Sequence, residues 1–130
     1  MASVLPALSE SAWIDLGLVG TYAANWGPIA ADVYRPMVRR MADGLVLCRG
    51  FVVKSAALTG AAESIFTFNA SWWPGDLGYN AAGTNVRFMV ACDTATLTQV
   101  SLTNVGVLGL VFGGSATATG IGGVSYSLLR

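Results

Sequence analysis

The chain has 130 residues, which is the length of one ordinary domain and enough to bury a core without disulfides or metal ions. Apolar residues make up 54% of the sequence and charged residues only 11%, where a typical globular chain has roughly 25% charged residues. Seven acidic and seven basic residues give a net charge of zero, which argues against a nucleic-acid partner. The surplus of apolar surface has to be covered by a membrane or by another subunit.

A membrane-spanning helix is not expected. Such a helix needs about 18 or more consecutive apolar residues, and the clean apolar runs, such as Val107–Phe112, are much shorter. Residues 1–8 also lack the basic start and the long apolar run of a secretory signal. We therefore expect no membrane insertion and assign the apolar surplus to self-association.

The start of the chain predicts an arm and then a folded domain. Residues 1–12 are expected to form an N-terminal arm, and residues 13–130 a single domain. Residues 20–31 contain glycine, asparagine and proline, which favour turns and loops. Trp13 and Trp26 flank these segments and are expected in the core or in an interface.

The next part of the chain predicts a β-hairpin. Residues 33–41 alternate in part between apolar and basic side chains, which favours a strand. Asp43-Gly44 between two apolar runs predicts a type I′ turn, in which both central residues have positive φ. The second strand of the hairpin is expected over residues 45–53.

The second half of the chain contains short segments rich in β-branched and aromatic residues, separated by turn signals. These segments are residues 64–68, 84–91, 97–102, 105–112 and 124–129. Residues 69–83 are expected to form a long loop. The sum is about seven or eight strands, which predicts an all-β, single-domain antiparallel β-sandwich with a jelly-roll-like arrangement.

Catalytic machinery is not expected. The chain contains no histidine, which removes the commonest general base and the commonest metal ligand. The seven acids are widely separated, and neither Cys48 nor Cys92 has a histidine to activate it. We therefore expect no enzyme activity, no metal site and no cofactor.

Four arginines lie within fifteen residues of one another, at Arg35, Arg39, Arg40 and Arg49. A polyanion site needs a broader basic face than these four side chains provide. We therefore expect them to be solvated or to lie in a subunit interface, and we expect no nucleic-acid binding.

An aromatic pair in the long loop is the candidate ligand site. Trp72 and Trp73 are followed by Asp76 and Tyr79, and binding residues gather on loops that a rigid scaffold holds. A flat ring face with a nearby carboxylate suits a sugar, because the ring stacks on the sugar and the carboxylate accepts hydrogen bonds from its hydroxyls. The alternative is that one ring closes the end of the sandwich or lies in a subunit interface.

Five features of the sequence combine into a pattern. They are an early tryptophan with alternating apolar residues, a tryptophan in a loop, a tyrosine-arginine step, a hairpin strand that ends in arginine-glycine, and a small closing strand. The corresponding segments are Trp13–Leu18, Trp26-Gly27, Tyr34-Arg35, Asp43–Gly50 and Gly122–Tyr126. In this pattern residues 13–127 resemble a phage virion domain found at the distal ends of tail and head fibres and in receptor-binding proteins. The usual Leu-Pro-Xaa-Gly-Tyr-Arg-Pro turn of that family is not matched by residues 68–75.

The resemblance implies a homotrimeric β-sandwich in the virion, at a tail or fibre tip, that binds a saccharide of the host surface and contacts other virion proteins. Two alternatives stay open. The same trimer would serve as a purely structural decoration protein of the capsid head, or the chain would be a free carbohydrate-binding module.

Overall fold

The computed structural model describes residues 11–55, 62–75, 85–91, 97–111 and 118–128. These residues form strands and short 3-10 helices. The strands are β1 (Ile14–Asp15), β2 (Gly20–Tyr22), β3 (Trp26–Pro28), β4 (Met37–Arg40), β5 (Leu45–Arg49), β6 (Phe51–Lys54), β7 (Glu63–Phe68), β8 (Asn85–Ala91), β9 (Leu97–Thr103), β10 (Val107–Leu110), β11 (Ala118–Gly120) and β12 (Ser125–Ser127). The 3-10 helices are η1 (Leu16–Leu18), η2 (Asp32–Tyr34) and η3 (Ala70–Trp72). None of the helices in the described ranges has the length and the apolar character needed to cross a membrane.

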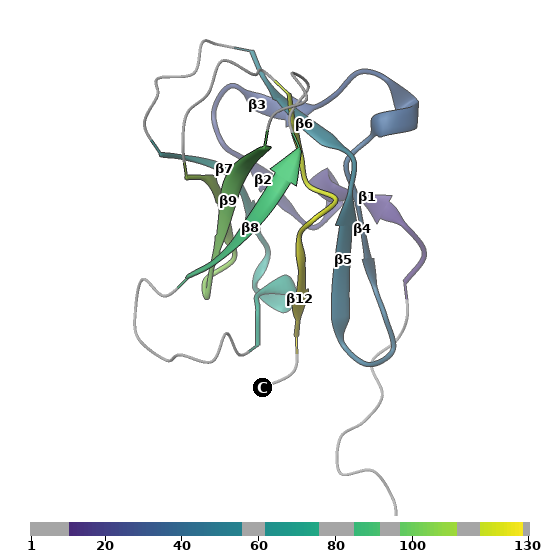
Figure 1. Ribbon diagram of the computed structural model, residues 1–130. Coiled ribbons are helices and arrows are strands. Elements are labelled where there is room, and N and C mark those ends of the chain that lie inside the picture. Colours follow the sequence, from purple (N-terminus) through teal and green to yellow (C-terminus); the bar gives the residue numbers. More distant parts are fainter. Residues whose placement is uncertain (1–10, 56–61, 76–84, 92–96, 112–117, 129–130) are drawn as a thin grey trace, which may run out of the picture.

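The strands form two layers that face each other (Figure 1). One layer is the five-stranded sheet β2-β7-β10-β9-β8. The other consists of the four-stranded sheet β1-β4-β5-β12 and the three-stranded sheet β11-β6-β3, which are joined because β6 follows β5 directly. All strand pairs are antiparallel, so the predicted all-β antiparallel sandwich is confirmed.

Gly50 divides the strand predicted over residues 45–53 into β5 and β6. Its φ is +97°, and a Cβ atom at this position would lie 2.3 Å from the backbone oxygen of Arg35. Only glycine adopts this conformation without strain and admits such a close approach. The bend lets β5 pair with β4 and β12 while β6 pairs with β3 and β11.

The β4–β5 hairpin is confirmed, but the predicted turn type is wrong. Gly44 has a φ of +88°, whereas Asp43 does not have positive φ. The Gly44 amide donates to the Met41 carbonyl at 2.9 Å, and the Met41 amide donates to the Leu45 carbonyl at 2.8 Å. The Leu45 amide also donates to Asp43 Oδ1 at 3.0 Å, so the Asp43 side chain stabilises a longer turn with one left-handed residue.

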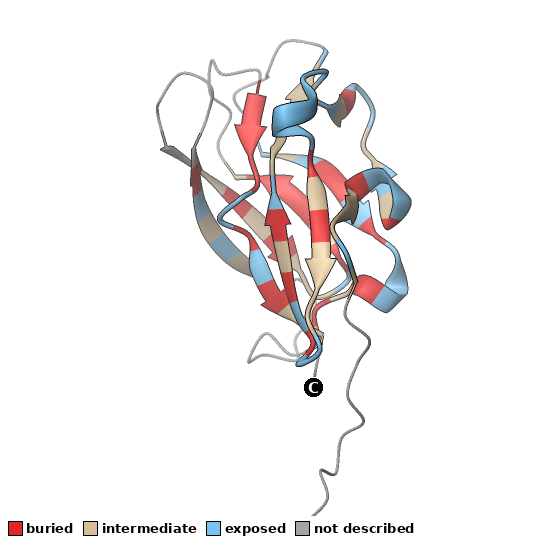
Figure 2. Ribbon diagram, turned by 90° about the vertical axis from the view of Figure 1, so that its right-hand side faces the viewer, coloured by how far each residue is buried: buried red, intermediate tan, exposed pale blue. Residues whose placement is uncertain are grey.

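The core lies between the two layers (Figure 2). The largest fully buried side chains are Phe66, Phe68, Leu16, Ile65, Leu102, Leu108, Ile121, Val38, Val46, Val52, Val100 and Val124. In β7, Ile65 and Phe66 are both buried although neighbouring strand residues point to opposite faces. The reason is a β-bulge, because Leu108 pairs with Phe66 while Gly109 pairs with Ser64 and Ile65 is the extra residue.

Two predicted strands are shorter in the structure. The segment at residues 33–41 begins with η2 and becomes β4 only after Pro36, a residue that cannot donate a hydrogen bond to a sheet. In the segment at residues 105–112, Val105 is exposed in a turn and β10 starts after Gly106. Because bends, bulges and turns divide the expected strands, the described residues form twelve short strands instead of seven or eight.

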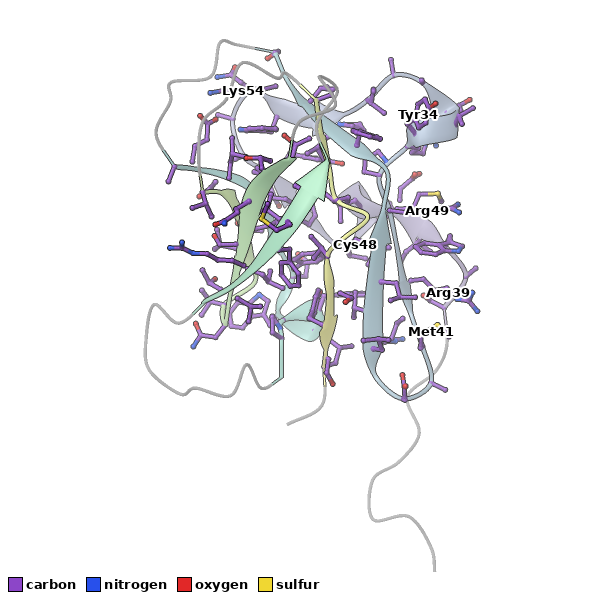
Figure 3. All side chains as sticks on the ribbon, viewed as in Figure 1. Tyr34, Arg39, Met41, Cys48, Arg49 and Lys54 are labelled. Atoms are coloured by element: carbon purple, nitrogen blue, oxygen red, sulfur yellow. The ribbon has the colours of Figure 1, made fainter. Side chains whose placement is uncertain are left out.

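The outer face of the β4–β5 hairpin combines apolar and basic side chains. Met37 pairs with Arg49 and Arg39 pairs with Leu47 across the two strands. Figure 3 shows Arg39 and Arg49 on the side of the hairpin opposite to the buried Cys48. The expected arm at residues 1–12 lies mostly outside the described residues. Its Ser11, however, is bound to β4 through the Ser11 amide and the Arg40 carbonyl at 2.9 Å.

Candidate functional site

The sequence-predicted tryptophan pair lies at one end of the sandwich. Trp72 is only 8% exposed, and Trp73 is half-buried against the core. The chain is not extended here, because Trp72 ends the 3-10 helix η3, so both rings can approach the core. The indole nitrogen of Trp73 donates to the Phe68 carbonyl at 2.8 Å, which fixes the direction of its ring.

The surroundings of Trp72 are also filled. The guanidinium of Arg40 lies over its ring, 5.2 Å from the centroid, and the Tyr126 hydroxyl donates to its carbonyl at 2.6 Å. Phe68 contacts Tyr126 edge to face at 5.6 Å. Trp72 thus packs at the end of the sandwich with its polar partners supplied by the protein.

Asp76 and Tyr79, the other two residues of the predicted ligand site, lie outside the described residues, as does Cys92. The ligand site at Trp72, Trp73, Asp76 and Tyr79 therefore stays a prediction. The structure brings together the two tryptophans, of which Trp72 is buried and Trp73 is partly exposed.

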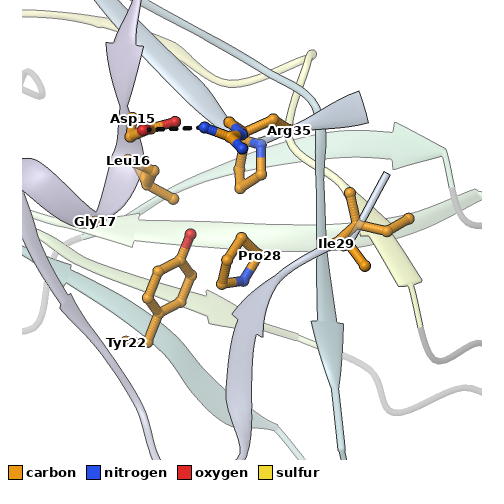
Figure 4. A pocket seen from close by; sticks show the side chains of 9 residues that line it. Asp15, Leu16, Gly17, Tyr22, Pro28, Ile29 and Arg35 are labelled. Carbon is orange, nitrogen blue, oxygen red and sulfur yellow. Dashed lines mark hydrogen bonds and ion pairs between the residues drawn. The ribbon is translucent and has the colours of Figure 1, made fainter. Parts of the chain in front are cut away.

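A different region of the molecule forms an open cavity of about 370 Å³ (Figure 4). It lies where β1 and η1 meet the end of β2 and the segment from β3 to β4. Its walls include Asp15, Leu16, Tyr22, Pro28, Ile29 and Arg35. A cavity of this size is within the range of about 300–1,000 Å³ that is typical of small-molecule sites.

Backbone pairing places the polar groups of this cavity. Asp15 pairs with Met37 at the edge of one layer, and the Leu16 amide donates to the Pro36 carbonyl at 3.1 Å. Tyr22 pairs with Phe66 of β7 in the other layer. The two layers therefore both contribute, and Figure 4 shows the Tyr22 hydroxyl pointing toward the Asp15–Arg35 pair.

Arg35 links two carboxylates at the rim of the cavity. Its Nη1 donates to Asp15 Oδ2 at 3.4 Å, and its Nη2 donates to Asp32 Oδ1 at 2.8 Å. The charge of Asp15, followed by the hydrogen bond and charge of Asp32, raises the pKa of Arg35. Because these side chains are exposed, the ion pairs orient the groups more than they stabilise the fold.

Tyr22 and Asp15 keep hydrogen-bonding capacity for a ligand. Burial, and after it the charge of Asp15, raises the pKa of Tyr22 to about 12, so its hydroxyl stays protonated near neutral pH. The Tyr22 ring contacts Phe66 edge to face at 5.1 Å, which holds it in place. Among the described residues the Tyr22 hydroxyl has no hydrogen bond. Asp15 Oδ1 also has none, but it is buried, so the accessible part of this exposed carboxylate is the Oδ2 side that faces Arg35.

A second polar cluster connects the layers through buried contacts. Lys54 Nζ lies 2.6 Å from Glu63 Oε1, and the indole nitrogen of Trp26 donates to the same oxygen at 2.9 Å. Lys54 and Trp26 share Glu63 Oε1, so this oxygen connects β3 and β6 of one layer with β7 of the other. Among the residues with described positions, no group of acidic or cysteine side chains is arranged to hold a metal ion.

Sequence reasoning missed the cavity. Asp15, Tyr22 and Arg35 are spread over twenty residues and follow no motif spacing, so only the pairing of β1 with β4 and of β2 with β7 brings them together. Two segments of the sequence pattern include cavity residues, Trp13–Leu18 with Asp15 and the tyrosine-arginine step with Arg35, but neither segment indicates a cavity by itself.

The sequence matches no protein-family model and no curated protein sequence. Among solved structures, the receptor binding protein (gp15) of Listeria phage PSA is similar to this chain, with a TM-score of 0.64 at 16% sequence identity. The match covers 91% of this chain and 64% of that one, so the chain spans less than two thirds of the length of the phage protein. At this identity the likeness shows a shared fold.

Proposed function

We propose that the chain is a phage virion protein, a receptor-binding domain at the tip of a tail or fibre that attaches to a saccharide of the host surface. The observation that supports it most is the fold shared with a phage receptor binding protein over 91% of the chain. The sequence pattern from Trp13 to Tyr126 resembles the same class of virion domain and is independent support.

The homotrimer is part of this proposal. Arginine, methionine and aromatic residues are enriched in protein interfaces. The outer face of the β4–β5 hairpin combines Met37, Leu47 and Arg49. The ring of Trp13 adds to this face, with its centroid 4.4 Å from the Arg49 guanidinium. Leu45 adds an exposed apolar side chain to this face. The low charged fraction of the chain also favours assembly.

Immunogold electron microscopy of the virions that contain the chain tests its location. The proposal predicts a few gold particles at the distal end of the tail or fibres. Dense label over the shell would support the capsid decoration protein instead, and virions without label would contradict both.

Light scattering of the purified chain tests the trimer. We expect about three chain masses for the natural chain and one chain mass for Leu45→Glu, because an unpaired charge in an interface opposes association. Val105→Glu is the control, since Val105 is an exposed apolar residue in a turn of the other layer. A natural chain that is monomeric would overturn the trimer.

A further inference from the structure

We propose that the cavity between Asp15, Tyr22 and Arg35 is the saccharide-binding site and that it takes a neutral sugar unit; this inference rests on the proposed function. It assigns the ligand to the side of the molecule that contains η1 and η2 and not to the tryptophan end.

The polar groups of the cavity match sugar hydroxyls in number and kind. Asp15 offers Oδ2 as an acceptor for hydroxyl protons, since Oδ1 is buried, and the contact of Oδ2 with Arg35 is long at 3.4 Å, which leaves acceptor capacity. The Tyr22 hydroxyl can both donate and accept, and the Arg35 guanidinium donates. Vicinal sugar hydroxyls present donors and acceptors side by side, so each of these groups finds a partner on one ring.

The walls of the cavity suit the apolar face of a sugar ring. Leu16, Pro28 and Ile29 are apolar residues of its lining (Figure 4). Leu16 is completely buried and Tyr22 is held against Phe66, so this part of the cavity is preformed. A preformed site avoids the entropy cost of ordering side chains on binding.

The charges around the cavity favour a neutral ligand over an anionic one. Arg35 is the basic residue among those that line it, and its charge is already shared between Asp15 and Asp32. A phosphate or a carboxylate in the cavity would meet the Asp15 carboxylate of the wall and a guanidinium already compensated by Asp15 and Asp32, which is unfavourable. A neutral sugar meets no such electrostatic repulsion.

The open shape of the cavity predicts weak binding by a single copy. A sugar that is partly exposed to water gains little from burial, so we expect a dissociation constant in the millimolar range. Three linked copies would raise the overall affinity for a repetitive surface without any new contact.

Amide-resolved NMR titration of the full chain tests the site. The probes are methyl glucoside, methyl galactoside, methyl rhamnoside and methyl N-acetylglucosaminide, with glucuronic acid and glucose 1-phosphate as anionic probes. We expect at least one neutral probe to give saturable shifts at the amides of Leu16, Gly17, Tyr22 and Ala30. We expect the anionic probes to bind at least about tenfold more weakly.

Two variants and two matched controls assign the contacts. Tyr22→Phe and Asp15→Asn are expected to weaken binding of the neutral probe about tenfold. Tyr22→Phe removes the hydroxyl, and Asp15→Asn replaces one acceptor oxygen by a donor and removes the charge, while both keep the shape of the side chain. Tyr34→Phe and Asp43→Asn make the same chemical changes outside the cavity and are expected to leave the affinity unchanged. The amide spectrum of each variant reports directly whether it is folded.

The results separate this inference from the proposed function. No saturable shift with any neutral probe, shifts confined to Trp72–Gly75, tighter binding of the anionic probes, or full affinity in both cavity variants would each overturn the cavity site. If the immunogold label is nevertheless at the tail tip, the result supports the receptor-binding function and contradicts only the cavity as the binding site.

Discussion

The tryptophan end and the Asp15 cavity use the same kinds of side chain in opposite ways. At the tryptophan end, Arg40 covers the ring of Trp72 and the Tyr126 hydroxyl donates to the Trp72 carbonyl. At the cavity, the Tyr22 hydroxyl faces open space and Arg35 lies at an exposed rim. In the first region the polar groups are paired within the protein, whereas in the second the Tyr22 hydroxyl has no partner among the described residues.

Aromatic residues in a loop therefore do not by themselves indicate a binding surface. A ring whose polar groups are hydrogen-bonded within the protein is packed, and a ring with an unpaired polar group can bind a ligand. Trp73 donates to the Phe68 carbonyl, so its one donor is already used. Tyr22 keeps its hydroxyl free of partners in the described part of the chain, and this is the feature that a ligand can use.

The largest effect is expected from removing the ring that closes the sandwich. Trp72→Ala should lower the free energy of unfolding by about 3–5 kcal/mol, because it leaves a cavity where a ring that is 8% exposed packs against the core. Urea denaturation measures the change. A decrease of less than about 1 kcal/mol in the free energy of unfolding would contradict a structural role of Trp72. The tryptophan end would then again be a candidate ligand site.

The next effect concerns the approach of the backbone to Trp73. Gly106 has a φ of +78°, and a Cβ atom there would lie 2.3 Å from Cδ1 of Trp73. Gly106→Ala should therefore cost roughly 2 kcal/mol or more and shift the tryptophan fluorescence. The control is Gly122→Ala, since Gly122 has no positive φ and a Cβ there meets nothing within 4 Å. Equal stability of the two variants would contradict the packing described for Trp73.

A pair of tyrosines compares the two regions directly. Tyr126→Phe leaves the buried Trp72 carbonyl without its donor and should cost about 1–3 kcal/mol. Tyr22→Phe removes a hydroxyl that has no partner in the described residues and should cost less than about 0.5 kcal/mol. Thermal or urea unfolding of both variants measures the two losses of stability. A larger loss for Tyr22→Phe than for Tyr126→Phe would contradict the described difference between the two regions.

The smallest effect is the pH dependence that Tyr22 contributes. Its pKa in the folded chain is about 12 against 10.0 for an unperturbed tyrosine, so the unfolded chain loses this proton first. The contribution of Tyr22 to stability is therefore complete below about pH 10 and is lost as the pH rises through 12. Burial raises the pKa of Cys48 from 9.0 to about 12 as well, so the stability of the natural chain begins to fall near pH 9.

Urea unfolding of the natural chain and of Tyr22→Phe at pH 8 and pH 11 measures how much of the pH-dependent loss of stability comes from Tyr22. The Phe variant should lose less stability between the two pH values, by under about 1 kcal/mol because Tyr22 is only half-buried. An identical loss in both chains would mean that the phenol is not desolvated and that the cavity is more open than the structure indicates.

The sequence predicted the fold to the extent that side-chain alternation determines it. The strand predicted over residues 84–91 corresponds to β8, where Arg87 and Met89 are exposed and Val90 is buried, as alternation requires. The bend at Gly50 and the bulge at Ile65 were not predictable, because alternation assumes that each strand is continuous.

The candidate site was less predictable than the fold. The sequence predicted only a loop over residues 69–83, and the 3-10 helix η3 within it determines the direction of both rings. Arg35 and Asp15 are twenty residues apart, and no local signal relates them before β1 pairs with β4. A site built from single residues on separate strands depends on tertiary pairing.

The most direct test of the account is competition for host cells between the purified chain and the phage that contains it. The account predicts that the natural chain and Asp43→Asn block phage adsorption, while Asp15→Asn, folded as judged by its amide spectrum, blocks at least about fivefold less well. Equal blocking by Asp15→Asn would contradict the cavity as the receptor site, and no blocking by the natural chain would contradict the receptor-binding function itself.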